Sequence, residues 1–155
     1  MAIGRCFEES FQKAMRSLET GFSGWGGDRE EPELTNTELD RQLRTPSPER
    51  IISVRTAMVR GRSDEEIHRI SRIDPWFLAK LRRIIEAEAR LIKGKSLDQL
   101  DAESLFEAKQ LGFSDRQIAW HTKSDELSVR QRRHQLDVRA VFKTVDTCAA
   151  EFASS

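Results

Sequence analysis

The sequence has few of the residues that usually point directly to chemistry. It contains two cysteines, Cys6 and Cys148, near opposite ends of its 155 residues and without the short spacing of a metal-binding pair. Sparse cysteines are typical of a reducing compartment, so we expect a cytoplasmic location. A chain of this length buries enough surface to fold without a disulfide or a structural metal.

Long apolar runs and an excess of one charge are also missing. No segment approaches the ~18 consecutive apolar residues of a membrane span, and no basic-then-apolar signal follows Met1. Lys and Arg together number 26, as do Asp and Glu, so the formal net charge is zero. Balanced charge gives no general attraction to nucleic acid or to an acidic membrane surface. We therefore expect no nucleic acid and no membrane as partners, and a protein partner instead.

The first part of the chain predicts one amphipathic helix and a linker. Apolar residues repeat at three- and four-residue spacings from Phe7 to about Thr20, and Gly21 is expected to end this helix. Residues 21–36 lose the periodicity and gain glycine and acidic residues. They are predicted to form a linker with Trp25 as an anchor.

Closely spaced helices are predicted over residues 37–137. Ser47 and Ser124 are expected to cap two of them, and Asp74 with Pro75 begins the longest. The apolar stripe of this longest helix is predicted to consist of Leu78, Leu81, Ile85, Ala89 and Ile92. Residues 138–155 carry β-branched and aromatic residues between polar ones, which indicates a short extended C-terminal segment.

An internal similarity decides the predicted architecture. The segment from Gly61 to Ile67 reappears 51 residues further on, from Gly112 to Ile118. Both copies contain a glycine that ends a helix and a capping box that begins the next one. The same offset relates Asp74 to Asp125 and Arg82 to Arg133. We predict an all-α fold, an orthogonal helical domain of two related helical lobes, with duplication and chance left open as origins.

Two glycine-containing segments resemble nucleotide-binding loops but lack required residues. Gly94 precedes Lys and Ser as in a phosphate loop, yet the glycine needed five residues earlier is Ala89. The segment beginning at Gly24 would need a further glycine where Arg29 stands. A helix end and a linker explain these glycines better.

No spacing of histidine, cysteine or acidic residues in the sequence indicates a catalytic or metal-binding site. The three histidines, at positions 68, 121 and 134, have no acidic or cysteine neighbour at a metal-ligand spacing. No positioned base can be named for Cys148 as a nucleophile. We predict no catalytic residue, no cofactor-binding residue and no metal ligand in this chain.

A helix-turn-helix is the alternative reading of residues 106–136. The last predicted helix carries Arg130, Arg132 and Arg133, and basic residues are typical of a DNA-binding helix. Its N-terminal turn, which would enter the major groove, instead carries Asp125 and Glu126. These carboxylates would repel phosphates, so a DNA-binding module is the weaker hypothesis.

Several stretches together resemble the carbamoyl-phosphate synthetase large subunits. They are residues 1–14, Ile73 to Leu78, Gly112 to Asp115, and the long segment from Phe142 to Phe152. The resemblance extends over all 155 residues in the family's order. Cys6 departs from it, because the family usually has threonine or serine there.

The resemblance implies the central connecting (oligomerisation) domain, which joins two ATP-grasp units and takes part in self-association. Residues 1–20 would end the preceding unit, 21–36 would be the linker, 37–137 the helical connecting domain and 138–155 the start of the following unit. The family's enzyme is an ATP-dependent ligase. It makes carbamoyl phosphate from bicarbonate, ATP with Mg or Mn, and ammonia from a glutaminase small subunit, for arginine and pyrimidine synthesis.

None of the family's catalytic residues has a position in this chain, so the resemblance implies a non-catalytic domain. If the domain self-associates, apolar residues beyond the core should form an exposed patch. The candidates are Trp120, Leu127 and Val129. A helical spacer that does not self-associate is the other hypothesis.

Overall fold

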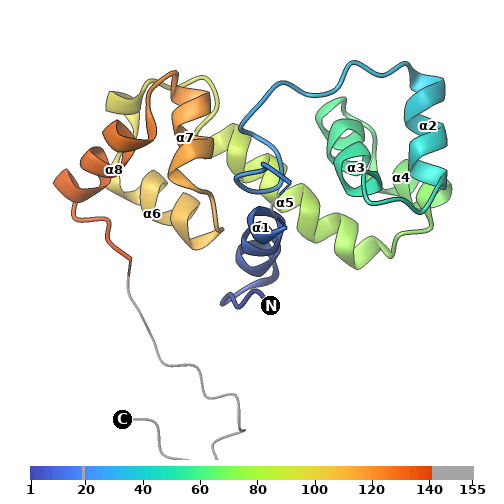
Figure 1. Ribbon diagram of the computed structural model, residues 1–155, viewed down its shortest axis with the longest axis horizontal. Helices are drawn as coiled ribbons and strands as arrows, with labels where there is room; N and C mark the ends of the chain where they lie inside the picture. The colour runs from blue at the N-terminus through green and yellow to red at the C-terminus, as the bar shows by residue number, and fades with distance from the viewer. Residues whose placement is uncertain (19, 141–155) are drawn as a thin grey trace, which may run out of the picture.

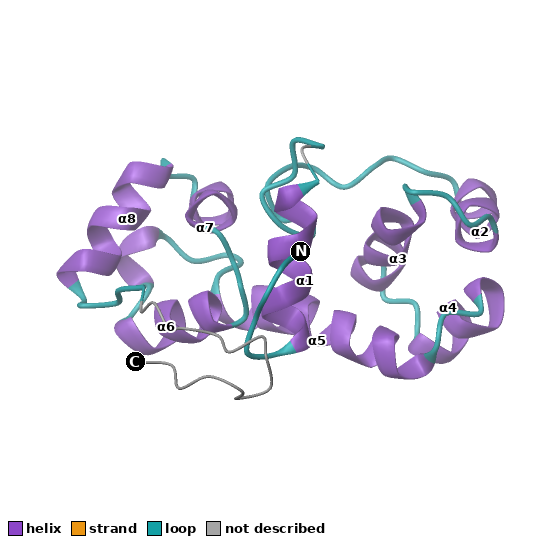
Figure 2. Ribbon diagram, turned by 60° about the horizontal axis from the view of Figure 1, so that its bottom comes forward, coloured by secondary structure: helices purple, strands orange, loops and turns teal. Residues whose placement is uncertain are grey.

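The computed structural model describes residues 1–18 and 20–140. Every element in these residues is helical, which confirms the predicted all-α class (Figure 2). The predicted extended segment 138–155 lies almost entirely outside the described residues. The elements are α1 (Phe7–Ser17), α2 (Asn36–Arg44), α3 (Arg50–Val59), α4 (Asp64–Ser71), α5 (Pro75–Leu91), the 3₁₀ helix η1 (Leu97–Gln99), α6 (Ala102–Gln110), α7 (Asp115–Thr122) and α8 (Glu126–Gln135).

Helix α5 is the spine that joins two helical lobes. The first lobe, α2 to α4, packs around one end of α5, and the second lobe, η1 to α8, lies at its other end (Figure 1). Helix α1 packs across α5 between the two lobes. Leu78 and Ile84 on α5 are fully buried, and burying such a side chain contributes roughly 1.5–3 kcal/mol.

The two lobes repeat the same helix-capping pattern. Ser63 accepts a hydrogen bond of 3.2 Å from the amide of Glu66, and Ser114 accepts one of 3.1 Å from the amide of Gln117. In both boxes the glutamate or glutamine side chain bonds back to the serine amide. The 51-residue offset also relates buried pairs: Val54 and Leu105, Ala57 and Ala108, Ile67 and Ile118, and Leu78 and Val129.

The same ion pair also occurs once in each lobe. Arg82 Nε lies 2.6 Å from Asp64 in the first lobe, and Arg133 Nη2 lies 2.6 Å from Asp115 in the second. Each pair fixes the first turn of the lobe's short helix to the longer helix that follows. The similarity between the two halves therefore extends from the sequence to these side-chain contacts.

Three predicted helix ends are corrected by the structure. Helix α1 ends at Ser17 rather than near Thr20. Helix α3 begins at Arg50, because Pro48 and Glu49 form a turn before it and Ser47 caps nothing. At the start of α8, the carboxylate of Asp125 accepts the amide of Ser128 at 2.9 Å, so this residue is the cap. The predicted cap Ser124 bonds Thr122 instead.

The predicted stripe of α5 is correct at its start and wrong in its middle. Leu78 and Leu81 are buried as expected, as is Ile92 just beyond the helix. In the middle, Ile84 is fully buried, whereas Ile85 is half-buried and Ala89 is exposed. The cause is that α5 contacts α1 and both lobes, so its buried face shifts along its length.

Part of the predicted linker is packed into the structure. Trp25 is fully buried, as an anchor should be, and its indole donates a 2.9 Å hydrogen bond to the carbonyl of Ile51 on α3. Gln117 on α7 donates to the side-chain oxygen of Gln12 and to the carbonyl of Gly26, at 2.9 and 2.8 Å. The amide of Trp25 also donates to Oε1 of Gln12 at 3.1 Å, so the segment is attached to α1 and to both lobes. The division into segments 1–20, 21–36, 37–137 and 138–155 stays a prediction.

Candidate interaction surface

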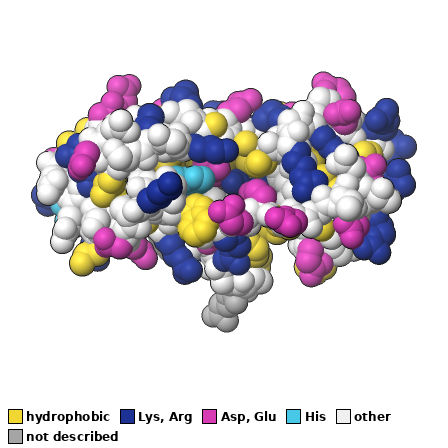
Figure 3. Space-filling view, turned by 90° about the horizontal axis from the view of Figure 1, so that it is seen from above, with side chains coloured by type: hydrophobic (Ala, Val, Ile, Leu, Met, Phe, Trp, Pro, Cys, Tyr) yellow, Lys and Arg dark blue, Asp and Glu magenta, His cyan; other side chains and the backbone are white. Residues whose placement is uncertain are grey.

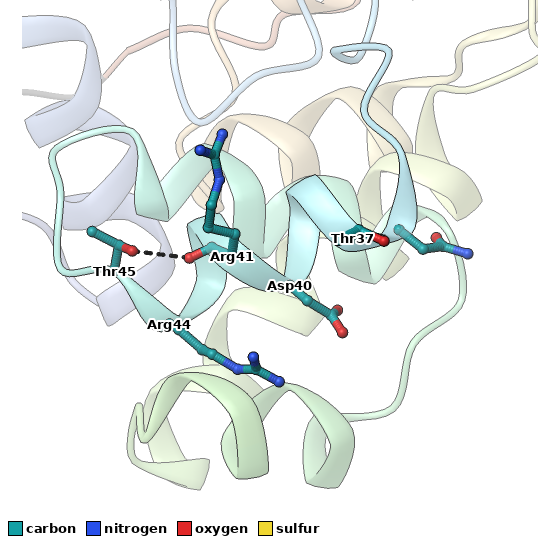
Figure 4. Close-up of a pocket in the computed structure, with 6 residues that line it drawn as sticks. Thr37, Asp40, Arg41, Arg44 and Thr45 are labelled. Carbon is teal, nitrogen blue, oxygen red and sulfur yellow. Dashed lines mark hydrogen bonds between the residues drawn. The ribbon is translucent and has the colours of Figure 1, made fainter.

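One pocket lies along α2 and has no catalytic arrangement. It has a volume of about 440 Å³, and side chains of one helix and its C-terminal end line it (Figure 4). Asp40 in its wall is an ion-pair partner of Arg62. Thr45 donates from its hydroxyl to the carbonyl of Arg41 at 3.0 Å. Figure 4 shows the side chains of Arg41, Asp40 and Thr37 pointing in different directions, so they do not converge on a common point.

The described residues offer neither a metal site nor a membrane-spanning helix. Among residues 1–18 and 20–140, no three His, Cys, Asp or Glu side chains gather as metal ligands. Within the described helices, none is long and apolar enough to cross a bilayer. Neither finding adds a candidate site.

A buried ionic cluster lies where the lobes meet α5. Arg55 of α3 and Glu88 of α5 have 3% and 6% of their side chains exposed, and Arg55 Nη2 lies 2.9 Å from both carboxylate oxygens. Glu31 accepts a 2.6 Å bond from Arg55 Nε, and His121 of α7 lies 3.4 Å from Glu88. Burial raises the pKa of Glu88, but the interactions with His121 and Arg55 outweigh it and lower that pKa below its ordinary value. The cluster therefore links α3 of the first lobe and α7 of the second lobe to α5.

The predicted self-association residues divide into two groups. Trp120 on α7 and Leu127 on α8 are exposed, at 45% and 63%, and α7 packs directly on α8. Val129 is fully buried, so it belongs to the core and is not part of an exposed surface. It occupies the place that Leu78 has in the first lobe, which is why it faces inward. We call Trp120 and Leu127 the second-lobe patch.

A hollow of about 430 Å³ adjoins this patch. Trp120 and Ala119 line it together with Arg116, Asp28 and Glu126. Its wall thus combines one large apolar side chain with both signs of charge. On the face shown in Figure 3, hydrophobic side chains likewise gather in small patches bordered by charged ones.

A second exposed apolar surface was not predicted from the sequence. Trp76 and Phe77 begin α5 and are 53% and 46% exposed. Phe7 packs on both, with ring centroids 5.4 and 5.8 Å away, and the Lys80 ammonium lies 5.5 Å from the Trp76 ring. We call Phe7, Trp76 and Phe77 the α5 patch. No local pattern marks these residues as exposed, because both have the residue types of a core and Phe77 precedes the buried Leu81 by four residues, a helical spacing.

Both patches include the same position of the repeat. Trp76 and Leu127 each stand two residues after the aspartate that caps their helix, Asp74 or Asp125. Monomeric proteins seldom expose several large apolar side chains together, and such patches mark contact sites.

These features define a two-lobed helical module with contact surfaces. In comparisons with known proteins, residues 1–137 match the model of the carbamoyl-phosphate synthetase large chain, oligomerisation domain. The chain belongs to this family, and its role is that of the oligomerisation domain of a carbamoyl phosphate synthase large chain.

Relatives from three groups of organisms are all carbamoyl phosphate synthase large chains. Over 152 residues the chain is 53% identical to a carbamoyl phosphate synthase large chain of Nostoc, covering 98% of this chain and 14% of the relative. It is 47% identical to the chloroplastic arginine-specific large chain of rice, covering all of this chain and 13% of that protein. A large chain of Archaeoglobus fulgidus is 43% identical, with 98% and 14% covered. The chain therefore spans about a seventh of the length of these relatives.

Proposed function

We propose that this chain is a non-catalytic connector that holds copies of a larger synthetase together through its second-lobe patch. The observation that carries the proposal is the exposure of Trp120 and Leu127 on two helices that pack on each other. Aromatic side chains at the centre of a contact commonly dominate its free energy. The family's description as an oligomerisation domain supports the same role.

The hollow beside Trp120 gives this contact a self-complementary form. In a two-fold dimer the same patch is used by both subunits, so Leu127 of one copy can meet the hollow of the other. The charged rim of that hollow, with Arg116 opposite Asp28 and Glu126, suits a two-fold contact because each copy offers both signs of charge.

The α5 patch is proposed to contact the flanking ATP-grasp units of the same subunit. Two separate apolar surfaces suit a module that meets two kinds of partner, its own copy and its neighbours in the chain. Trp76 and Phe77, with Lys80 beside them, offer an aromatic surface with a cationic edge.

The parent enzyme is proposed to be an ATP-dependent, glutamine-hydrolysing carbamoyl-phosphate synthase of the cytoplasm. The relatives' names support a carbamoyl phosphate synthase as the parent, and the arginine-specific rice protein supports arginine synthesis as one destination of the product. ATP with Mg or Mn and ammonia from a glutaminase small subunit would be used by the parent's other units. The present chain would bind none of them.

Sedimentation of two matched double variants tests the connector role. Trp120→Ser with Leu127→Ser should abolish concentration-dependent association, whereas Trp76→Ser with Phe77→Ser should leave it unchanged. Circular dichroism and melting temperature establish that both proteins remain folded. Association that survives loss of the second-lobe patch would refute the assignment of the surface.

A separate assay tests the absence of catalysis. The purified chain is incubated with ATP, Mg and bicarbonate, and phosphate release is followed. No bicarbonate-dependent hydrolysis is expected. Hydrolysis that copurifies with the chain and requires bicarbonate would refute the non-catalytic part of the proposal.

A further inference from the structure

A different hollow lies between α1 and the second lobe. Its volume is about 470 Å³, and its walls come from α1, the end of α6, and residues 138–140 after α8. Phe113 and Val138 give it an apolar floor. Helix α1 reaches the turn after α6 here, where Gln12 Nε2 donates to the carbonyl of Leu111 at 3.4 Å. We call this hollow the α1–α6 pocket.

The lining of the α1–α6 pocket is strongly basic. A single carboxylate, that of Glu9, lies in the wall, and a second, that of Asp115, lies just behind it. The basic side chains in the wall are Arg5, Lys13, Arg16, Lys109, Arg133 and Arg139. Positive charge is therefore concentrated around this cavity, although the formal net charge of the chain is zero.

The two carboxylates are each shared between two cations. Glu9 lies 2.8 Å from Lys13 and 3.7 Å from Arg5. Asp115 lies 2.9 Å from Lys109 and 2.6 Å from Arg133. Each carboxylate thus neutralises one of its two partners, and Asp137 pairs with Arg139 at 2.9 Å. Because three carboxylates pair with these six cations, positive charge is left over around the pocket.

Arg16 adds a further cation that pairs with no carboxylate among the described residues. Its guanidinium is half-buried, and Nη1 donates a 2.8 Å hydrogen bond to the carbonyl of Gly112. Burial lowers the pKa of Arg16, and the charges of Glu9 and Asp115 do not fully offset the effect. Burial likewise lowers the pKa of Lys109, with repulsion from Arg133 and Arg16 adding to it. Burial therefore destabilises the charged forms of Arg16 and Lys109, and a bound anion would stabilise them.

We propose that the α1–α6 pocket binds a small polyvalent oxyanion of the phosphate class. Arginine presents a planar fork of donors that matches the oxygen atoms of a phosphoryl group, and lysine adds a point charge. Arg16 belongs to α1 and Lys109 to α6, and both line the pocket, so a bound anion would bridge α1 to the second lobe. A monocarboxylate would leave most of the surplus charge uncompensated, so pyrophosphate binds more tightly than acetate.

Titration of the purified chain with pyrophosphate at constant ionic strength tests this site. Nuclear magnetic resonance should show saturable shifts in the amides of α1 and of the α6–α7 turn, and the melting temperature should rise with pyrophosphate. Acetate at the same ionic strength should produce neither effect. Shifts confined to another part of the chain, or no saturable shift, would overturn the proposal.

Two charge-matched variants make the assignment specific. Arg16→Gln should weaken pyrophosphate binding about tenfold or more, because it removes a charge-assisted contact. Arg130→Gln removes the same charge from an exposed position of α8 outside the pocket and should bind like the unchanged chain. Equal weakening in both would indicate only general charge attraction and would overturn the site. If Arg16→Gln does not fold, the resonance shifts of the unchanged chain decide alone.

Discussion

Arg55 and Glu88 form a buried ion pair in which one guanidinium nitrogen lies 2.9 Å from both carboxylate oxygens. The two residues come from α3 and α5, and His121 of the second lobe lies beside the same carboxylate. A buried pair of this kind is costly to break because the remaining charge loses its partner. The cluster therefore fixes the arrangement of the lobes on α5.

Removing one member of this pair should destabilise the fold strongly. Glu88→Gln leaves the Arg55 charge buried with only Glu31 beside it and is expected to lower the free energy of unfolding by about 3 kcal/mol. Urea denaturation followed by circular dichroism measures the change. Glu86→Gln is the control, because residue 86 is exposed on the same helix. Equal effects of the two changes would contradict the structural role of the pair.

Acid should weaken the fold through carboxylates whose pKa the fold lowers. The pKa of Glu88 is lowered although burial opposes this, and the pKa of Asp115 is lowered by Arg133 and Lys109 although burial opposes it. Ordinary values for these groups are about 4.3 and 3.9, so their contribution is present above this range and is lost as the pH falls through the lowered folded values. The stability difference between the unchanged chain and Glu88→Gln should be full at pH 6 and shrink towards pH 3. A difference that grew in acid would show the opposite sign of linkage.

The repeated ion pairs predict unequal effects of the same substitution in the two lobes. Asp115 has 11% of its side chain exposed and binds both Arg133 and Lys109, whereas Asp64 has 25% exposed and pairs with Arg82 alone. Asp115→Asn should therefore cost about 2 kcal/mol and Asp64→Asn about 1 kcal/mol. Denaturant midpoints measure both. A larger loss at Asp64 would contradict this ranking.

The two glycines that end the equivalent helices provide another matched test. Gly61 and Gly112 have φ angles of +84° and +88°, which disfavour any side chain. A β-carbon on Gly112 would also meet the backbone of Glu9 at 3.0 Å, whereas one on Gly61 would meet no atom within 4 Å. Gly61→Ala should cost roughly 1 kcal/mol from the backbone, and Gly112→Ala roughly 2 kcal/mol or more. Equal losses would show that α1 does not approach Gly112 closely.

Local signals in the sequence predicted much of the fold. The capping boxes at Ser63 and Ser114 were predictable because they depend on side chains three residues apart. The offset between Asp64 and Asp115 further indicated the two lobes. Ser47 and Ser124 were wrongly predicted to be helix caps. A turn separates Ser47 from α3, and Asp125, which follows Ser124, caps α8.

Tertiary contacts account for what the sequence could not predict. Arg55 and Glu88 are 33 positions apart, and no local pattern indicates that they meet. Trp76 and Phe77 have the residue types of a core, and only the final packing of α5 leaves them exposed. Val129 was misplaced on the surface for the opposite reason, because polar neighbours surround it in the sequence of α8.

Sedimentation velocity of the unchanged chain over a hundredfold range of concentration tests the central claim most directly. The proposed role predicts a reversible shift from monomer to dimer or a larger species as concentration rises. A monomer at every concentration would contradict self-association through the second-lobe patch and would favour a helical spacer.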